Sequence, residues 1–441
     1  MIGSEKIDTL LEARWIIPVE PAGVVLSDHA IAINGGMIRA IVPSAEAHAR
    51  FAPEEHIVLE NHALMPGLVN LHTHAAMSLM RGIADDLPLM EWLNNHIWPA
   101  ETRHVDSGFV FDGTRLACAE MLRGGITCFN DMYFYPEAAT RAAVASGMRA
   151  SIGMIAIDFP TAYASDADDY LAKGLALRDE YNRHPLLSFC FAPHAPYTVS
   201  DRVFNKILTY AEQLDLPIHI HLHETRDEIS DSVKIHGVRP VERLHRLGLL
   251  GPNLIAVHRV HLDNGEIELM AQQGCTVAHC PSSNLKLGNG LAPIISLLNA
   301  DVNVGIGTDG AASNNRLDMF EEMRFTALLA KGRSGGANML PAWQALQMAT
   351  LNGARALGLG ALIGSLVAGK AADIIALDFS SLELSPCYDP VSHLVYAAGR
   401  EHVSHVWVNG KILLNCGELT TLDERELLLR AEFWRGQMAV G

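Results

Sequence analysis

The sequence has no long apolar segment, and its positive charges are outnumbered. No stretch of 18 uncharged apolar residues occurs among its 441 residues, so no membrane-spanning helix is predicted. Asp and Glu number 50 against 33 Lys and Arg, which gives a formal net charge of −17. Because a phosphate backbone attracts clustered Lys and Arg, neither nucleic acid nor an anionic membrane is expected as a partner. The expected partner is a small molecule.

Cysteine is sparse and follows no disulfide or metal pattern. The seven cysteines are odd in number, and none has C-x-x-C spacing. Most lie in apolar surroundings, as in Ser188-Phe-Cys-Phe191, so buried reduced thiols in a cytoplasmic protein are expected. The segment Met1–Asp8 lacks the apolar core of a secretory signal peptide, which favours the same location. A homo-oligomer is plausible, although no motif specifies one.

Several common catalytic motifs are also absent. The sequence contains no G-x-x-x-x-G-K-[ST] and no H-E-x-x-H. The segment Gly305–Gly310 does match G-x-G-x-x-G, but it lies late in the chain and has Asp309 in its turn. The Ala-Ala-Ser-Asn-Asn that follows is a poor helix start, so a dinucleotide site is not predicted.

The middle of the chain alternates apolar strand-like runs with helical segments. Amphipathic segments such as Asp112–Arg123 and Asp201–Gln213 separate these runs. Alternation of this kind indicates parallel β/α units, and eight of them predict a (β/α)8 barrel of the TIM type, in the α/β class. The expected strands are residues 67–74, 126–131, 151–157, 187–193, 217–223, 253–259, 275–280 and 302–308.

Both ends of the chain instead show short strands joined by turns. Gly35-Gly36 separates the runs 29–34 and 37–42, and Asn409-Gly410 separates 405–408 from 411–414, which predicts two β-hairpins. Neither end is long enough to form a good core alone. We therefore expect one small β-sandwich domain built from both termini. The predicted division is residues 1–62 and 363–441 for this domain and residues 63–362 for a catalytic, metal-dependent barrel.

The pair His72-Thr-His74 ends the first expected barrel strand. Residues i and i+2 of a strand face the same side, so both imidazoles can reach one metal ion. Neutral imidazole is a common ligand of Zn²⁺. A lone His-x-His pair is more often a pair of surface or core histidines, and only further strand-end ligands make the metal site the better interpretation.

The segment His219-Ile-His-Leu-His-Glu224 supplies such ligands. Strict alternation places His219, His221 and His223 on one face, and at least one of them is a candidate ligand. Glu224 has the opposite parity. It can share a site with His221 only if the strand ends near His223 and the chain turns. Solvent-satisfied histidines are the alternative.

Two later strands also end in polar residues. His258 closes an apolar strand and is a candidate ligand or base, and His261 could serve instead. Asp309 follows the Gly-rich strand near residue 306 and is a candidate metal ligand and proton acceptor. The alternative for Asp309 is an N-cap of the following helix.

Together these motifs resemble the amidohydrolase superfamily, and the resemblance covers nearly the whole chain. A narrower resemblance is to the methylthioadenosine/S-adenosylhomocysteine deaminases, in the branch that also holds triazine hydrolases. The segments that carry the narrower resemblance are Arg81–Leu93, Trp98–Glu101, Ala192–Tyr197 and Ser283–Gly290. The resemblance implies hydrolytic deamination of an adenine nucleoside: 5′-methylthioadenosine, S-adenosylhomocysteine or adenosine.

The resemblance also implies the roles of individual residues. Glu224 would contact the substrate ring and act as a proton shuttle, and His258 with Asp309 would orient the attacking water and take its proton. One divalent ion per chain is implied, with Zn²⁺ preferred and Fe²⁺ or Mn²⁺ as alternatives. The implied metal ligands are His72, His74, His221 and Asp309.

Further residues would bind substrate. Glu101 would bind the ribose hydroxyls, His194 would contact the substrate, and Trp92 would line the base pocket. Glu224 and Asp309 would also touch the ring. The region Phe189–His194 has no Lys of the kind that bridges two metals in dinuclear relatives, which is why one ion is expected.

Two alternatives to this function remain. The first is hydrolysis or deamination of another aminated ring, such as guanine, a pterin or an s-triazine, with the same metal chemistry in a different pocket. The second is a barrel that has lost catalysis and serves as a scaffold or binding protein. The second requires loss of ligands, and the candidate ligands are all present.

Overall fold

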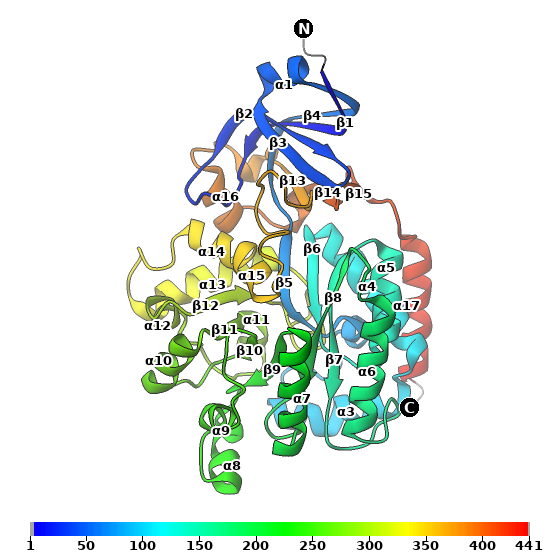
Figure 1. Cartoon of the computed structure of the whole chain (residues 1–441), viewed down its shortest axis with the longest axis vertical. Helices are drawn as coiled ribbons and strands as arrows, with labels where there is room; N and C mark the ends of the chain where they lie inside the picture. The colour runs from blue at the N-terminus through cyan, green and yellow to red at the C-terminus, as the bar shows by residue number, and fades with distance from the viewer. Residues whose placement is uncertain (1–3, 440–441) are drawn as a thin grey trace.

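The computed structural model describes residues 4–439, which form two eight-stranded sheets (Figure 1). One sheet is parallel, and its strands lie side by side in sequence order, as a barrel built from β/α units requires. All eight strands expected from the sequence are confirmed, and each observed strand end lies within two residues of the expected one. They are β5 (Leu68–Thr73), β6 (Ile126–Asp131), β7 (Arg149–Ala156), β8 (Leu187–Pro193), β9 (Ile218–Leu222), β10 (Leu254–His258), β11 (Thr276–His279) and β12 (Asn303–Ile306).

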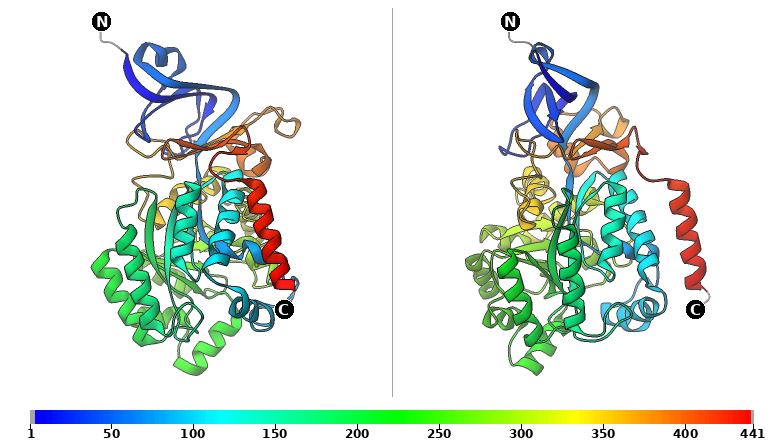
Figure 2. Two further views of the ribbon diagram at one scale, coloured as in Figure 1. Left: turned by 90° about the vertical axis from the view of Figure 1, so that its right-hand side faces the viewer. Right: turned by 45° about the vertical axis from the view of Figure 1, so that its right-hand side comes forward.

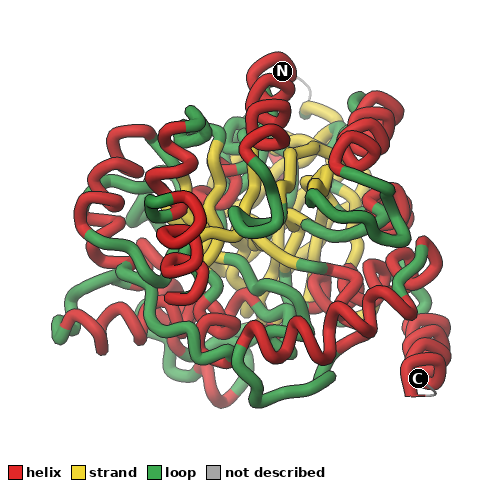
Figure 3. Tube along the Cα trace, turned by 90° about the horizontal axis from the view of Figure 1, so that it is seen from below, coloured by secondary structure: helices red, strands yellow, loops and turns green. Residues whose placement is uncertain are grey.

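Hydrogen bonds beyond β12 close the parallel sheet into a ring, which Figure 3 shows from below. The Asp309 amide donates to the His72 carbonyl at 2.9 Å, and the Thr308 amide donates to Asn70 Oδ1 at 3.0 Å. Gly307 permits this contact, because a Cβ there would lie 2.7 Å from the His72 nitrogen. The glycines that match a nucleotide motif thus have a packing role: they let the last strand approach the first.

Helices surround the ring and begin and end at recognisable caps. At α10, Asp263 and Glu266 form a reciprocal capping box, and Gly274 ends the helix with a φ of 71°. The helices of this layer are α4 (Ser107–Arg123), α5 (Pro136–Ser146), α6 (Ala167–Tyr181), α7 (Asp201–Leu214), α8 (Arg226–His236), α9 (Pro240–Arg246), α10 (Asn264–Gln273), α11 (Pro281–Lys286), α12 (Ile294–Asn299), α13 (Met319–Ser334), α14 (Ala342–Met348) and α15 (Leu351–Ala356).

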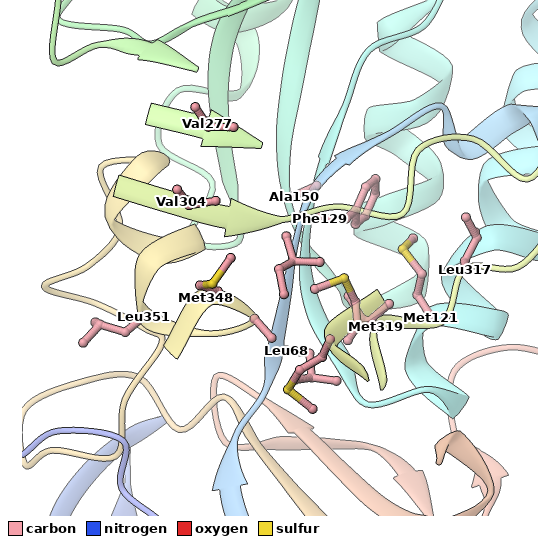
Figure 4. Close-up of a cluster of buried hydrophobic side chains, with 14 of the residues drawn as sticks. Leu68, Met121, Phe129, Ala150, Val277, Val304, Leu317, Met319, Met348 and Leu351 are labelled. Atoms are coloured by element: carbon pink, nitrogen blue, oxygen red, sulfur yellow. The ribbon is translucent and has the colours of Figure 1, made fainter. Parts of the chain in front are cut away.

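The barrel core lies between these helices and the strands, which are buried on both faces in β5, β6 and β7. Figure 4 shows part of it. Met121 of α4 and Met319 of α13 lie near Leu68 and Phe129 of the strands, and all four side chains are buried. Unbranched methionine side chains fill irregular gaps between branched and aromatic ones. This packing makes the barrel a rigid support for whatever its strand ends carry.

The second sheet is built from both termini, as predicted. Its two hairpins turn at Gly35-Gly36 and Asn409-Gly410, where all four residues have positive φ. The strand order is β16-β15-β14-β13-β4-β1-β2-β3. The bounds are β1 (Glu5–Ile16), β2 (Leu26–Asn34), β3 (Met37–Pro43), α1 (Ser44–Arg50), β4 (Phe51–Pro66), β13 (Ile374–Asp378), β14 (Val403–Val408), β15 (Lys411–Asn415) and β16 (Glu418–Leu419).

One hydrophobic cluster joins the N-terminal and C-terminal halves of this sheet. Leu11 and Ile31 come from the first half, Ile374 and Trp407 from the second, and all are buried. Neither half could bury this face alone. The division into residues 1–62, 63–362 and 363–441 stays a proposal for the domain boundaries, since β4 itself runs across residue 62.

The C-terminal helix α17 (Glu424–Ala439) leaves the second sheet and lies along α4 of the barrel (Figure 2). Glu426 pairs with Arg115, and the Trp434 indole N–H donates to Asp112 at 2.8 Å. Between β13 and α17, α16 (Pro390–Tyr396) packs near α13 and α14. No helix within residues 4–439 has both the length and the apolarity needed to cross a bilayer.

The two sheets meet at the end of the barrel where the strands begin, because β4 runs into β5 with only Gly67 between them (Figure 1). A buried ion pair joins them there. Asp373 accepts two hydrogen bonds from the Arg149 guanidinium, at 2.8 and 3.1 Å, and a third from the Asn409 amide. Both charged side chains are at most 3% exposed. The opposite end of the barrel is left free for a site.

We predict that Asp373→Asn lowers the free energy of unfolding by about 3–5 kcal/mol, because it leaves the Arg149 charge buried without its partner. Glu424→Gln is the matched control. It removes the exposed pair with Arg123, worth about 0–1 kcal/mol. Urea denaturation followed by circular dichroism measures both, and equal losses for the two variants would contradict the role of the buried pair.

Candidate active site

A cavity of about 520 Å³ opens at the carboxyl ends of the barrel strands. Its floor carries polar residues that follow β5, β9, β10 and β12. Its outer wall comes from the segment between β5 and α4, which holds η1 (Ala75–Met80), α2 (Leu89–Trp92), η2 (Leu93–Ile97) and α3 (Trp98–His104). The carboxyl ends of the strands are where active sites of such barrels lie.

Four donor atoms converge at the floor of the cavity. Asp309 Oδ1 lies 3.3 Å from His72 Nε2 and 3.3 Å from His74 Nε2. His221 Nε2 lies 3.2 Å from His72 Nε2. Zinc sits about 2.0–2.1 Å from such ligands, so neighbouring donors of a tetrahedral site lie about 3.3–3.4 Å apart. The four residues therefore fit a single zinc-sized ion.

The protonation pattern of the histidines suits this purpose. His74 Nδ1 donates to the Met132 carbonyl, and His221 Nδ1 donates to the His194 carbonyl at 2.8 Å. A carbonyl can only accept, so the lone pair of each neutral ring is on Nε2, the nitrogen that faces the other donors. Burial also holds the pKa of His221 well below its usual range. Both rings therefore present Nε2 to a cation.

His219 supports the third imidazole from behind. A hydrogen bond of 3.0 Å joins His72 Nδ1 to His219 Nε2, and burial lowers the pKa of His72 to about 4. The two histidines of β9 and His223, which follows it, therefore have different roles. His221 faces the donor cluster, His219 orients His72, and His223 turns away to accept a hydrogen bond from the Val241 amide at 3.3 Å.

Asp309 completes the cluster as a carboxylate. Burial opposes its ionisation, but contact with His72 and His74 holds its pKa well below the usual range. Its Oδ2 accepts a hydrogen bond from the Ser283 hydroxyl at 2.6 Å and lies 4.0 Å from His258 Nε2. Asp309 has a φ of 63° and lies three residues after the end of β12, and the next helix, α13, is capped by Asp318, so Asp309 is not a helix cap.

His258 and Glu224 form a second pair above the donor cluster. His258 Nδ1 donates to Asn284 Oδ1 at 2.9 Å, which leaves Nε2 as an acceptor 3.6 Å from Glu224 Oε2. Glu224 Oε1 accepts a hydrogen bond from Asn289 at 2.9 Å. Burial raises the pKa of Glu224, against the opposing effect of His258. An acid and a base thus stand side by side.

The turn after β9 brings Glu224 to the site despite its parity. The strand ends at Leu222, and His223 has a φ of 56°, a left-handed conformation that redirects the chain. The buried Glu228 carboxylate fixes the turn by accepting the amides of His223 and Glu224 at 2.9 and 2.8 Å. His258 also has positive φ. Such conformations are unfavourable and cluster at functional sites.

The walls of the cavity carry the remaining residues that the sequence singled out. Glu101 Oε1 accepts a hydrogen bond from the Tyr133 hydroxyl at 2.8 Å, and burial raises the pKa of Glu101 to about 7. His194 lines the cavity and is hydrogen-bonded to the Thr198 hydroxyl at 3.1 Å. Trp92 also lines it, with its indole N–H donated to the Ile83 carbonyl.

The structure brings together the residues whose roles the family resemblance implied, but not every histidine that the sequence offered as a candidate. His261 lies apart from the donor cluster, so His258 is the histidine of that strand that belongs to the site. Sequence reasoning assigned no role to the supporting residues. Ser283, Asn284 and Asn289 lay in a recognised motif, and His219 was one of three equivalent histidines, but Tyr133 and Glu228 carried no signal.

Comparison with known proteins identifies the family. The sequence profile of the Amidohydrolase family matches residues 63–413. The chain belongs to this family. Among full-length relatives, the 5-methylthioadenosine/S-adenosylhomocysteine deaminase of Saccharophagus degradans is 50% identical, over 99% of this chain and 98% of its own length. That of Teredinibacter turnerae is 47% identical, over 99% of both chains.

Solved structures agree with this amidohydrolase fold. An adenosine deaminase from Xanthomonas campestris with bound zinc has a TM-score of 0.98 and 50% identity, covering 99% of this chain and 100% of that one. Atrazine chlorohydrolase from Arthrobacter aurescens, complexed with zinc, has a TM-score of 0.89 and 24% identity, covering 97% and 99%. The second likeness shows the shared fold alone.

We predict that His219→Ala weakens zinc binding about 10- to 100-fold, because His72 loses the partner that fixes its orientation. Competition with a chromogenic chelator measures the dissociation constant. His223→Gln is the matched control, since it changes a buried histidine two residues further that does not touch the donor cluster. Unchanged affinity in the His219 variant would remove its supporting role.

Proposed function

We propose that this amidohydrolase is a metal-dependent deaminase of adenine nucleosides. The observation that carries the proposal is the placement of Glu224 and His258, 3.6 Å apart, directly above four convergent metal donors. This is the arrangement that hydrolysis of an aminated ring needs: a water-activating centre with an acid and a base beside it. Relatives with about half their residues identical, over nearly the whole length, bear the name of such deaminases.

One divalent ion per chain is part of the proposal, with Zn²⁺ preferred over Fe²⁺ and Mn²⁺. Bound zinc in the Xanthomonas campestris structure supports the choice of metal. The end of β8, which lacks a Lys, supports a single ion. When bound, the ion would supply a nucleophile at neutral pH by lowering the pKa of water from 15.7 to about 7. The residues that would hold it are His72, His74, His221 and Asp309.

Residues of the chain would accept and donate the protons of the reaction. His258 Nε2, free to accept because Nδ1 donates to Asn284, would take a proton from the attacking water together with Asp309. As the oxygen bonds to C6 of the adenine ring, negative charge moves to ring N1. Glu224, whose pKa is raised by burial, would give its proton to N1. The proton taken by His258 and Asp309 would then pass to the amino nitrogen, and the proton of the new C6 hydroxyl would return to Glu224. Cleavage of the C6–N bond then releases ammonia and the inosine-type product.

The outer wall would recognise the sugar. Glu101 offers a carboxylate that can accept hydrogen bonds from the two ribose hydroxyls, and Tyr133 holds it in place. His194 and Trp92 would contact the substrate nearby. A bare guanine, pterin or s-triazine ring carries no pair of ribose hydroxyls for this carboxylate to bind. Glu101 is therefore the residue that favours a nucleoside over those alternatives.

The setting proposed for the enzyme is the cytoplasm, with a small-molecule substrate and no nucleic acid partner. The net charge of −17 and the seven free cysteines support it. A homo-oligomer stays a proposal without a structural argument.

We predict ammonia release from 5′-methylthioadenosine, adenosine or S-adenosylhomocysteine by zinc-loaded enzyme, and little or none from guanine, a pterin or atrazine. Glu224→Gln should lower turnover of the nucleosides about a hundredfold or more at retained zinc content, because an amide cannot give up and regain a proton as a carboxyl does. A coupled ammonia assay over this panel, with zinc measured by mass spectrometry, tests both. Near-normal turnover in the loaded variant would refute the proton-shuttle role.

We also predict a pH-dependent KM that Glu101 controls. Below its pKa of about 7 the carboxyl is protonated, and one oxygen becomes a donor that can no longer accept from ribose. KM for a nucleoside should rise about tenfold from pH 8 to pH 6, because the ionised fraction of the Glu101 carboxyl falls about tenfold over this range. Glu101→Gln should raise KM at pH 8 and flatten the profile. Parallel profiles for the two proteins would contradict the ribose assignment.

A further inference from the structure

One side of the active-site cavity is an aromatic and aliphatic surface that the proposed chemistry does not use. It is formed by the loop after β6 and by the end of β7 with the loop that follows it. We call it the aromatic wall, and it consists of Phe134, Tyr135, Ile155, Ile157, Phe159 and Tyr163.

The aromatic wall begins beside the residue proposed to bind ribose. Tyr133, which donates to Glu101, has its ring 6.3 Å from His74 and 5.4 Å from Phe134, measured between centroids. Tyr133 therefore stands between the donor cluster and the wall. A nucleoside with its ring at the floor and its ribose at Glu101 would direct its remaining substituent, on the 5′ carbon, to this wall.

The wall offers no positive charge. Among the cavity-lining residues in the described part of the chain, none is Lys or Arg. Lys173 of the neighbouring helix α6 already has partners within the protein. Lys173 Nζ donates to the Tyr163 carbonyl and to Asp169, and it lies 5.1 Å from the centroid of the Tyr163 ring. A carboxylate on the 5′ substituent would find no Lys or Arg partner among the lining side chains.

Thr161, in the loop that carries part of the wall, is already hydrogen-bonded within the protein. Thr161 Oγ1 is hydrogen-bonded to the Tyr170 hydroxyl and accepts from the Tyr163 amide at 3.2 Å. The Tyr135 and Tyr163 rings pack edge to face, with their centroids 5.1 Å apart. Moving a charged or strongly polar tail from water to such a surface is unfavourable. An apolar substituent loses nothing there, and a thioether sulfur gains contacts with aromatic edges.

We propose that the aromatic wall binds an uncharged, apolar substituent on the 5′ carbon, best matched by an alkyl thioether, and selects against a tail with free amino and carboxylate groups. This rests on the proposed function and narrows it: among the adenine nucleosides, 5′-methylthioadenosine is the preferred substrate. S-adenosylhomocysteine, with its charged amino acid tail, is a poor one. Adenosine has a 5′ hydroxyl that gains no contact with the wall. Its kcat/KM should lie between the values for the other two nucleosides or close to that for S-adenosylhomocysteine.

The proposal is tested by kcat/KM of zinc-loaded enzyme for the three nucleosides. The value for 5′-methylthioadenosine should exceed that for adenosine about tenfold or more, since a buried methyl group is worth about fourfold and a sulfur–aromatic contact about two- to tenfold. It should exceed that for S-adenosylhomocysteine at least about tenfold. Comparable values for the thioether with and without the charged tail would overturn the proposal and leave the proposed function intact.

Phe159→Arg tests the wall directly. Phe159 is 46% exposed at the rim, so an arginine there is compatible with folding and supplies the missing cation. The ratio of kcat/KM for 5′-methylthioadenosine to that for S-adenosylhomocysteine should fall about tenfold. Phe159→Leu should lower only the value for the methylthio substrate. Phe433→Arg, which changes an equally exposed phenylalanine of α17, should leave the ratio unchanged.

The outcomes separate the two proposals. An unchanged ratio in Phe159→Arg, with a normal circular dichroism spectrum, would overturn the role of the wall even if every nucleoside is deaminated. Failure of the wild-type enzyme to release ammonia from any of the three would overturn the proposed function, and the assignment of the wall would fall with it.

Discussion

The convergence of three imidazole nitrogens and one carboxylate oxygen at the mouth of the barrel is the constraint on which the rest of the site depends. Such a cluster is unfavourable unless each ring is neutral and held in one orientation. His74 and His221 are held by backbone carbonyls, and His72 by His219. Each of these hydrogen bonds crosses between strands. The site is therefore stable only when the ring of strands is closed.

Closure of the ring of strands depends on small residues where the last strand meets the first. The contacts that stabilise the barrel and those that form the site lie at opposite ends of it. Gly307 lets β12 approach β5 closely enough for Asp309 to reach His72. At the other end, the Arg149–Asp373 pair ties the barrel to the second sheet without approaching the cavity. Stability and chemistry are thus placed at opposite ends of the same strands, and loops around the cavity can differ between relatives without disturbing the support.

Much of this arrangement could be predicted from the sequence, because strand ends and side-chain parity are local properties. The eight barrel strands, the two hairpins and the nomination of His72, His74 and Asp309 needed only periodicity and order. Parity also showed that Glu224 required a turn at His223, which the left-handed backbone there supplies. The roles of His219 and His223 could not be separated, since both alternate identically along β9 and differ only in what neighbouring strands place behind them.

The sequence alone determined which side chains end the strands and therefore the class of chemistry, because alternation of apolar strands and helices leaves few ways to arrange them. Only the tertiary structure decided the supporting contacts of Ser283, Asn284 and Asn289, and the make-up of the cavity's outer wall. Those contacts join residues far apart in the chain, and the wall comes from loops whose paths have no periodicity. Long-range packing sets the positions of these residues and loops, and a local sequence pattern does not predict such packing.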